Sequence, residues 1–222
     1  MKERIWELDF LRVLAIGLMI TFHIVYDLNA FTEVNINLDG LWYWVGKVSA
    51  LTFIVVSGIS SGLGKNSIKR GISVFGYGMI ITVVTYVLMP DNFVVFGILH
   101  LLGIGMILSP VFHKINKWAL LILSLVLISL NLLVENILID TPYFLAVGIR
   151  SYGFKSIDYY PLIPYLGVFM FGVFIYQIFY FKRKSAFKYS LNNKYITWIS
   201  QNSLKIYLLH QPIILTFIYV FS

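Results

Sequence analysis

Long apolar stretches follow one another along almost the whole chain, separated by short polar connections. A helix needs about 20 mostly apolar residues to cross the hydrocarbon core of a bilayer. Seven stretches of this kind are present, at roughly 8–30, 41–63, 71–89, 94–112, 118–138, 162–181 and 195–221. The pattern therefore predicts an all-α integral membrane protein, with residues 1–222 forming a single domain of about seven transmembrane helices. The first stretch is interrupted by charged residues and lacks a cleavage site, so we expect a retained helix rather than a signal peptide.

The basic residues of the connections lie mainly on one predicted side of the membrane. Cytoplasmic loops of membrane proteins carry an excess of Lys and Arg. Twelve basic residues fall on the side of the N-terminus, namely Lys2, Arg4, Lys65, Lys69, Arg70, Lys114, Lys117, Lys182, Arg183, Lys184, Lys188 and Lys194. Only Arg150 and Lys155 fall on the other side, and all five tryptophans lie at predicted helix ends. We therefore expect a multi-pass protein of the cell membrane, with a cytoplasmic N-terminus and an extracytoplasmic C-terminus.

Composition supports the membrane assignment and excludes several other classes. Hydrophobic residues make up 59% of the chain and charged residues only 12%, against about 25% charged residues in soluble domains. The formal net charge of +7 follows the topology, so no nucleic-acid partner is expected. Cysteine is absent, which excludes disulfides, thiolate metal sites and a thiol nucleophile.

Three histidines lie at similar depth on three different predicted helices. Ionisable residues inside a membrane span are costly and usually mark function. At about 1.5 Å of rise per residue, His23, His100 and His210 all fall in the outer half, with Lys47 near them. Helix–helix hydrogen bonds would explain any one of these histidines, and snorkelling would explain Lys47. Three histidines at the same depth in the membrane favour a functional site. His113, on a predicted cytoplasmic loop, is interpreted as an interfacial residue.

The first of these histidines has an acidic neighbour on its own helix. His23 and Asp27 are four residues apart, so they share a helical face and can touch. A carboxylate beside an imidazole fixes its tautomer and raises its basicity, as a general base requires. Three histidines could instead bind zinc. Neither H-x-x-x-H nor H-E-x-x-H occurs in the chain, so no metal is expected.

Arg12 lies near the cytoplasmic end of the first predicted helix, in LDFLRVLAIGLMITFH, with ten residues between it and His23. An arginine at this place is often a positive-inside anchor. Here, however, one helix presents a guanidinium near the cytosol and an imidazole near the outside. Such a helix could hold an anionic cofactor at one end and support chemistry at the other.

The segment LDFLRVLAIGLMITFH resembles the opening helix of transmembrane acyltransferases, including the acyltransferase-3 proteins with their Arg, ten residues, His signature. The rest of the chain is most similar to the heparan-alpha-glucosaminide N-acetyltransferase catalytic-domain family of membrane proteins. The matching segments are FHIVYDL, FIVVSGISSGL, VFGILHLLGIGMIL, DYYPLIPYLGVFMFGVFIY and SLKIYLLHQPII. The chain departs from the lysosomal enzyme of that family in one loop. That enzyme has its proposed active histidine in the outer loop after this helix, and here the loop, FTEVNINLDG, contains none.

The resemblance implies transfer of an acetyl or acyl group from cytosolic acetyl-CoA, or another acyl-CoA, to a hydroxyl or amine at the extracytoplasmic face. The acceptor would be glycan-like or a small molecule, and a homo-oligomer is left open. His23, oriented by Asp27, would deprotonate the acceptor or carry the acyl group briefly. His100, His210 and Lys47 would stabilise the oxyanion or position the acceptor.

The acyltransferase hypothesis also gives roles to residues at the two ends of the helices. Arg12 and Arg70 would attract the phosphates of CoA. Asp158, Tyr159 and Tyr160 lie at the predicted outer mouth and would contact the acceptor, although a solvated carboxylate with interfacial aromatics explains them equally well.

Two other classes of function are compatible with the same residues. A proton-coupled transporter or channel could use the intramembrane histidines as a relay, and a non-catalytic membrane scaffold would need none of them. Paired inverted repeats would favour transport, and the sequence shows none.

Overall fold

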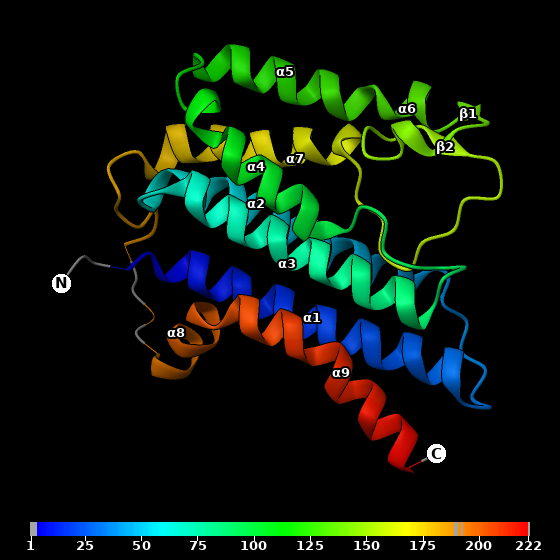
Figure 1. Ribbon diagram of the computed structural model, residues 1–222. Coiled ribbons are helices and arrows are strands. Elements are labelled where there is room, and N and C mark those ends of the chain that lie inside the picture. The colour runs from blue at the N-terminus through cyan, green and yellow to red at the C-terminus, as the bar shows by residue number, and fades with distance from the viewer. Residues whose placement is uncertain (1–3, 189–190, 192, 222) are drawn as a thin grey trace. The chain divides into compact units, whose positions relative to one another are not determined.

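The computed structural model describes residues 4–188, 191 and 193–221, and most of these are helical (Figure 1). Six helices are long and apolar enough to cross a membrane: Trp6–Phe31, Leu41–Leu63, Ser67–Leu88, Lys117–Val134, Leu162–Tyr180 and Ser203–Phe221. A shorter apolar helix spans Ile98–Phe112. These seven helices correspond to the seven predicted stretches, and the prediction of an all-helical multi-pass membrane protein is confirmed. The direction in which the chain crosses the membrane stays a prediction.

The boundaries differ from the predicted ones in three places. The fourth helix, α4 (Ile98–Phe112), begins after a loop rather than at residue 94. The fifth stretch is formed by α5 (Lys117–Ser129) and α6 (Asn131–Val134), and it ends before residue 138. The last stretch is divided at Asn202 into α8 (Lys194–Gln201) and α9 (Ser203–Phe221). The Trp198 carbonyl near the end of α8 accepts from the Asn202 backbone N–H at 3.1 Å and from the Asn202 side-chain amide at 2.9 Å.

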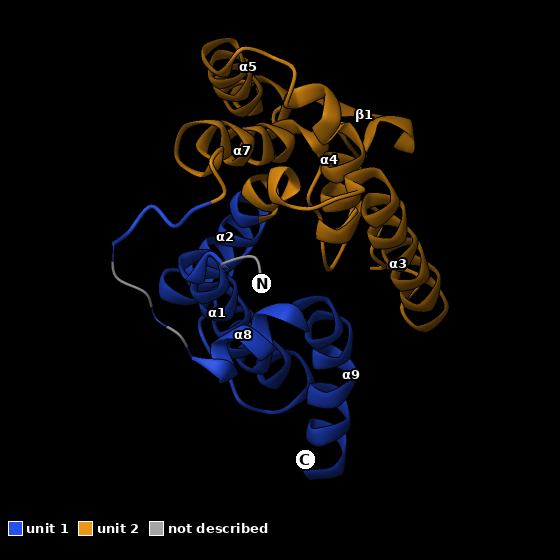
Figure 2. Ribbon diagram, turned by 90° about the vertical axis from the view of Figure 1, so that its left-hand side faces the viewer, with its two compact units in different colours: residues 1–56, 184–222 blue, residues 57–183 orange. Residues whose placement is uncertain are grey.

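The chain forms two compact units, residues 1–56 with 184–222 and residues 57–183 (Figure 2). The first unit contains α1 (Trp6–Phe31), the first part of α2 (Leu41–Leu63), α8 and α9. In this unit α1 packs against both α8 and α9. The Ser49 hydroxyl of α2 donates to the Ala15 carbonyl of α1 at 2.8 Å. Unit 1 is thus organised around α1, the helix that contains Arg12, His23 and Asp27.

The second unit is built on close helix contacts made by small residues. Its α3 (Ser67–Leu88) packs against α4, and α7 (Leu162–Ile175) packs against both α4 and α5. A Cβ added to Gly103 would lie 2.7 Å from the backbone nitrogen of Phe75, so only glycine permits this approach of α3 and α4. The Ser124 hydroxyl donates to the Gly167 carbonyl at 2.8 Å and fixes α5 to α7. A π-helix, η2 (Tyr176–Tyr180), continues α7.

The connection between α6 and α7 is the main irregular segment of unit 2. It contains β1 (Leu138–Ile139), the short 3₁₀-helix η1 (Pro142–Phe144) and β2 (Arg150–Ser151). The two strands pair in parallel, and the Arg150 guanidinium donates to the Glu135 carbonyl at 3.0 Å. A single β-bridge between Phe96 and Tyr159 attaches this segment to the chain just before α4.

Candidate active site

Two of the predicted histidines meet at the contact between α1 and α9. The ring centroids of His23 and His210 are 4.8 Å apart, with the ring planes tilted by 59°. His210 is 8% exposed, and the edge-on ring of Phe22 lies 5.5 Å from His23. Counting depth along separate helices thus predicted a pair of residues that are 187 positions apart in the sequence. We call His23 and His210 the histidine pair.

The surroundings of His210 indicate which ring nitrogen carries its hydrogen. Its Nδ1 lies within hydrogen-bond distance of the Tyr207 carbonyl oxygen. A carbonyl can only accept, so Nδ1 donates and the lone pair of a neutral ring is on Nε2. That Nε2 atom is buried, and no partner for it exists among the described residues. His23 Nδ1 is likewise buried without a hydrogen-bond partner in the part of the chain that the structure describes. The pair therefore offers an unpaired basic nitrogen inside an apolar bundle.

Asp27 has a different partner from the one the sequence suggested. The Gln211 side-chain amide donates to both of its carboxylate oxygens, at 3.0 and 2.8 Å. No hydrogen bond between Asp27 and His23 is present among the described residues, and the Asp27 side chain is 1% exposed. Gln211 was not predicted, although it directly follows His210 in the segment LLHQP. Its Oε1 atom is also buried without a partner in the described chain.

The Asp27–Gln211 contact leaves a negative charge near the histidine pair. A neutral amide solvates a carboxylate but does not neutralise it, and a buried carboxylate is costly without a nearby positive charge. Asp27 is one helical turn from His23 on α1, and Gln211 is next to His210 on α9. Stabilisation of a protonated histidine by Asp27 stays a prediction.

Lys47 belongs to the same unit as the histidine pair. It is a partly buried residue of α2. Its neighbour Gly46 packs against Phe22, since a Cβ on Gly46 would lie 3.0 Å from the Phe22 ring. This contact places the Lys47 backbone near the level of His23. Its contact with an acceptor stays a prediction.

His100 lies in unit 2, and both of its ring nitrogens have partners. Nδ1 accepts from the Gly97 backbone N–H at 3.1 Å, and Nε2 lies 3.4 Å from the Thr82 hydroxyl oxygen. That hydroxyl donates to the Val94 carbonyl at 2.7 Å. The ring is 2% exposed and stacks on Phe96 with centroids 5.4 Å apart. These contacts hold the first turn of α4 against α3, which is a structural role; the predicted part in catalysis stays untested.

Asp158 and Tyr159 connect the irregular segment of unit 2 to its helices. An Asp158 carboxylate oxygen accepts from the Ile98 backbone N–H at 3.1 Å, at the start of α4. Burial raises the pKa of the Asp158 carboxyl to about 6, and the hydrogen bond from Ile98 opposes this shift. The Tyr159 hydroxyl donates to the Leu145 carbonyl at 2.7 Å, and burial raises its pKa to about 12. Both side chains have structural partners, and their contact with an acceptor stays a prediction.

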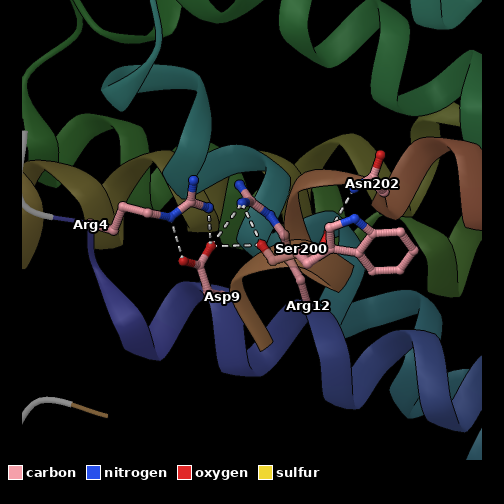
Figure 3. A network of polar contacts seen from close by, with 6 residues as sticks. Arg4, Asp9, Arg12, Ser200 and Asn202 are labelled. Atoms are coloured by element: carbon pink, nitrogen blue, oxygen red, sulfur yellow. Dashed lines mark hydrogen bonds and ion pairs between the residues drawn. The ribbon is translucent and has the colours of Figure 1, made fainter. Parts of the chain in front are cut away.

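A second polar cluster lies at the beginning of α1 (Figure 3). Arg4 donates through Nε and Nη2 to the two oxygens of Asp9, both at 2.8 Å. The Ser200 hydroxyl of α8 donates to Asp9 at 2.6 Å and accepts from Arg12 at 3.2 Å. Arg12 Nη1 is itself 3.6 Å from an Asp9 oxygen. We name Arg4, Asp9, Arg12 and Ser200 the arginine cluster; its two guanidinium groups and one carboxylate give it a net charge of +1.

Only part of the arginine cluster was predicted. Arg12 was predicted from its spacing to His23. Ser200 was not predicted, because it is 188 residues from Arg12 in the sequence. Asp9 is 5% exposed, whereas the Arg12 side chain keeps 26% of its surface exposed. The second predicted phosphate ligand, Arg70, is an exposed residue of α3 in unit 2. Its guanidinium packs over Gly64 in the turn between α2 and α3.

Two remaining expectations concern His113 and metals. His113 Nε2 lies 3.1 Å from the Ser61 hydroxyl oxygen, and its ring is edge-on to Tyr176 at 5.1 Å. It therefore takes part in the packing of unit 2 rather than lying on a loop surface. Within the described residues, no group of three or more His, Cys, Asp and Glu side chains could hold a metal ion.

Comparison with known proteins gives one match that covers most of the chain. The profile of the heparan-alpha-glucosaminide N-acetyltransferase catalytic family matches residues 4–212. No curated protein and no solved structure matches. The matched range includes the arginine cluster, Asp27, Gln211 and both members of the histidine pair. The chain belongs to the heparan-alpha-glucosaminide N-acetyltransferase catalytic-domain family, a family of acetyltransferases that use acetyl-CoA.

Proposed function

We propose that the protein is a membrane-bound acyltransferase that moves an acetyl group, or a longer acyl group, from cytosolic acyl-CoA to an acceptor at the extracytoplasmic face. The acceptor is a hydroxyl or an amine of a glycan-like or small molecule. The observation that carries this proposal is the histidine pair, whose unpaired nitrogens are buried at the contact of α1 and α9. Membership of an acetyltransferase family supports the reaction type.

The histidine pair can serve as the general base. As the acceptor oxygen or nitrogen attacks the thioester carbonyl, its proton passes to His210 Nε2, the atom that the Tyr207 contact leaves with a lone pair. The new C–O or C–N bond replaces the C–S bond, and the leaving thiolate takes up the proton as the free CoA thiol. Asp27 stabilises the imidazolium formed between these two steps. The sequence suggested His23 as the base, and the pair makes His210 an equal candidate.

A second route uses the same residues in two steps. An unprotonated imidazole nitrogen attacks the thioester and carries the acyl group, which the acceptor then removes. The net transfer is the same in both routes. A labelled acyl group that stays on the protein when the acceptor is omitted would distinguish the second route from the first.

The arginine cluster is suited to the phosphates of the donor. Its net charge of +1 attracts an anion, and the Arg12 side chain, 26% exposed, lies where an anion can reach it. Arg12 and His23 are eleven residues apart on α1, which corresponds to about 16 Å along the helix axis. The extended pantetheine arm of an acyl-CoA is long enough to bridge such a separation. Arg70 is retained as a second proposed contact to the phosphates.

The direct test is binding of acetyl-CoA to the purified protein in lipid nanodiscs, followed by transfer of a radiolabelled acetyl group to a panel of amino and hydroxyl sugars. We expect saturable binding, and transfer that is lost when the histidine pair is changed. Absence of binding to acetyl-CoA and to longer acyl-CoAs would contradict the proposal. Proton flux through the protein in sealed vesicles without any transfer would favour the transporter alternative.

A further inference from the structure

The helix α8 presents an aromatic face to its surroundings. It is eight residues long, or about 12 Å, and therefore cannot cross a hydrocarbon core of about 30 Å. Tyr195 and Trp198 are 68% and 61% exposed. Because they are three residues apart, they lie on one face of the helix. This face is not explained by the proposed transfer reaction.

The opposite face of α8 is fixed to unit 1. Ser200 is 3% exposed and donates to Asp9 of α1. The Asn193 side chain caps the start of the helix by accepting from the backbone N–H groups of Tyr195 and Ile196, at 2.8 and 3.3 Å. Because α8 is held on one side and capped at its start, its aromatic face is directed outward in a set orientation.

The sequence segment that contains α8 has charge of a single sign, and the carboxylates of Glu7 and Asp9 of α1, which contact it, are buried. Residues 159–222 contain no Asp or Glu but have six basic residues, Lys182, Arg183, Lys184, Lys188, Lys194 and Lys205. Four of them in unit 1, Lys184, Lys188, Lys194 and Lys205, are exposed, and the first three lie in or just before α8. The Lys194 ammonium lies 5.3 Å above the Tyr195 ring, so charge and aromatic surface lie side by side. A negatively charged partner that also accepts aromatic rings is complementary to this surface.

We propose that α8 is an interfacial helix that binds anionic phospholipid. Tyr195 and Trp198 lie among the lipid headgroups, where amphipathic rings are preferred. Lys184, Lys188 and Lys194 bind the phosphates and the net negative charge of the lipid surface, which attracts basic segments next to a membrane. This surface is separate from the histidine pair and gives the protein a preference for a class of lipid that its membrane-spanning helices alone do not provide.

The proposal is tested by lipid quenching of Trp198 fluorescence. Full-length protein is reconstituted in nanodiscs that contain brominated phosphatidylglycerol or brominated phosphatidylcholine at equal fractions. The emission of a Trp198→Phe variant is subtracted, so that only Trp198 is followed. We expect stronger quenching by the anionic lipid, with a preference of several-fold in apparent affinity. The triple variant Lys184→Gln, Lys188→Gln, Lys194→Gln should reduce this preference to near one and keep some quenching by both lipids. Each lysine is expected to contribute up to about fivefold.

A matched variant and a competitor define the outcomes that overturn the proposal. Lys155→Gln removes one exposed charge from unit 2 and should leave the preference unchanged. Equal quenching by the two lipids would refute binding of anionic lipid, and absence of quenching by either would show that the aromatic face does not contact lipid. Loss of the preference on addition of acetyl-CoA would assign the lysines to the donor instead. Thermal unfolding of each variant verifies that the comparison is made between folded proteins.

Discussion

The Gln211 side-chain amide donates to both carboxylate oxygens of Asp27 and so connects α9 to α1 beside the histidine pair. The two oxygen distances are 3.0 and 2.8 Å, and the carboxylate is almost fully buried. This contact has two separable effects. It sets how α9 lies against α1, and it keeps a negative charge near His23 and His210.

Exchanging the two residues separates these effects. Asp27→Asn removes the negative charge and Gln211→Glu places two carboxylates face to face, so each should reduce acetyl transfer. The double variant restores an amide–carboxylate contact but moves the charge from α1 to α9. If geometry dominates, the double variant should recover most of the transfer rate that the single variants lose, as a double-mutant cycle would show. Additive losses would show that the two residues do not act together.

His100 is predicted to matter for stability rather than for chemistry. His100→Ala removes the acceptor of the Gly97 N–H and the group that faces Thr82, and should lower the free energy of unfolding by about 1–3 kcal/mol. Thr82→Val removes the contact to His100 together with the Thr82 hydrogen bond to the Val94 carbonyl, but it keeps the hydrogen bond between His100 and the Gly97 N–H and should cost less. Thermal unfolding and acetyl transfer per folded molecule check both. A folded, inactive His100→Ala protein would instead support the catalytic role that the sequence suggested.

The raised pKa of Asp158 predicts a stability change with pH. The carboxyl titrates near pH 6 in the folded protein and near pH 4 in an unfolded chain. The folded state therefore binds the proton more tightly, and its stability falls as the pH rises from about 4 to about 6. Asp158→Asn keeps an oxygen for the Ile98 N–H and lacks this titration. The variant should gain stability relative to wild type across that range, by up to about 3 kcal/mol. A difference in unfolding temperature that shrinks with rising pH would contradict the assignment.

Arg12 is predicted to act on the donor. Arg12→Ala should weaken acetyl-CoA binding, measured by calorimetry in nanodiscs, because it removes the partly exposed guanidinium of the arginine cluster. Dephospho-CoA thioesters, which lack one phosphate, should lose less affinity on the same substitution if Arg12 contacts that phosphate. Arg12→Lys keeps the charge but not the planar donor pair. Its affinity for acetyl-CoA should lie between those of wild type and Arg12→Ala. Unchanged affinity in a folded Arg12→Ala protein would show that Arg12 does not bind the donor and that its contacts with Ser200 and Asp9 are structural.

The helices and the histidine pair could be predicted because both depend on spacing within a single helix. Apolar length identifies a span, and depth counting brings His23 and His210 to the same level. The partner of Asp27 could not be predicted in this way. Residues four apart on a helix differ by about 40° in direction, and the rotation of α9 against α1 decides which neighbour Asp27 meets. That rotation is set by packing and has no local signal in the sequence.

Several structural contacts that the sequence did not predict involve polar side chains that bond to the backbone. The break at Asn202 falls in the polar segment SQNS at residues 200–203, where the backbone and side chain of Asn202 both bond to the Trp198 carbonyl. His100 and Asp158 seemed available for chemistry because an ionisable residue near a membrane is rare. In the structure each accepts from a backbone N–H at the first turn of α4.

The central claim is that the histidine pair does the chemistry, and one measurement tests it most directly. The initial rate of acetyl transfer from radiolabelled acetyl-CoA is compared among wild type, His23→Ala, His210→Ala and the matched control His113→Ala, with binding of acetyl-CoA and thermal unfolding measured on the same samples. Removal of the histidine that acts as the base should lower the transfer rate by about 10²–10⁴-fold with donor binding intact. Removal of the other member of the pair should lower the rate less. His113→Ala should keep its activity per folded molecule. Full activity in folded His23→Ala and His210→Ala proteins would contradict the claim.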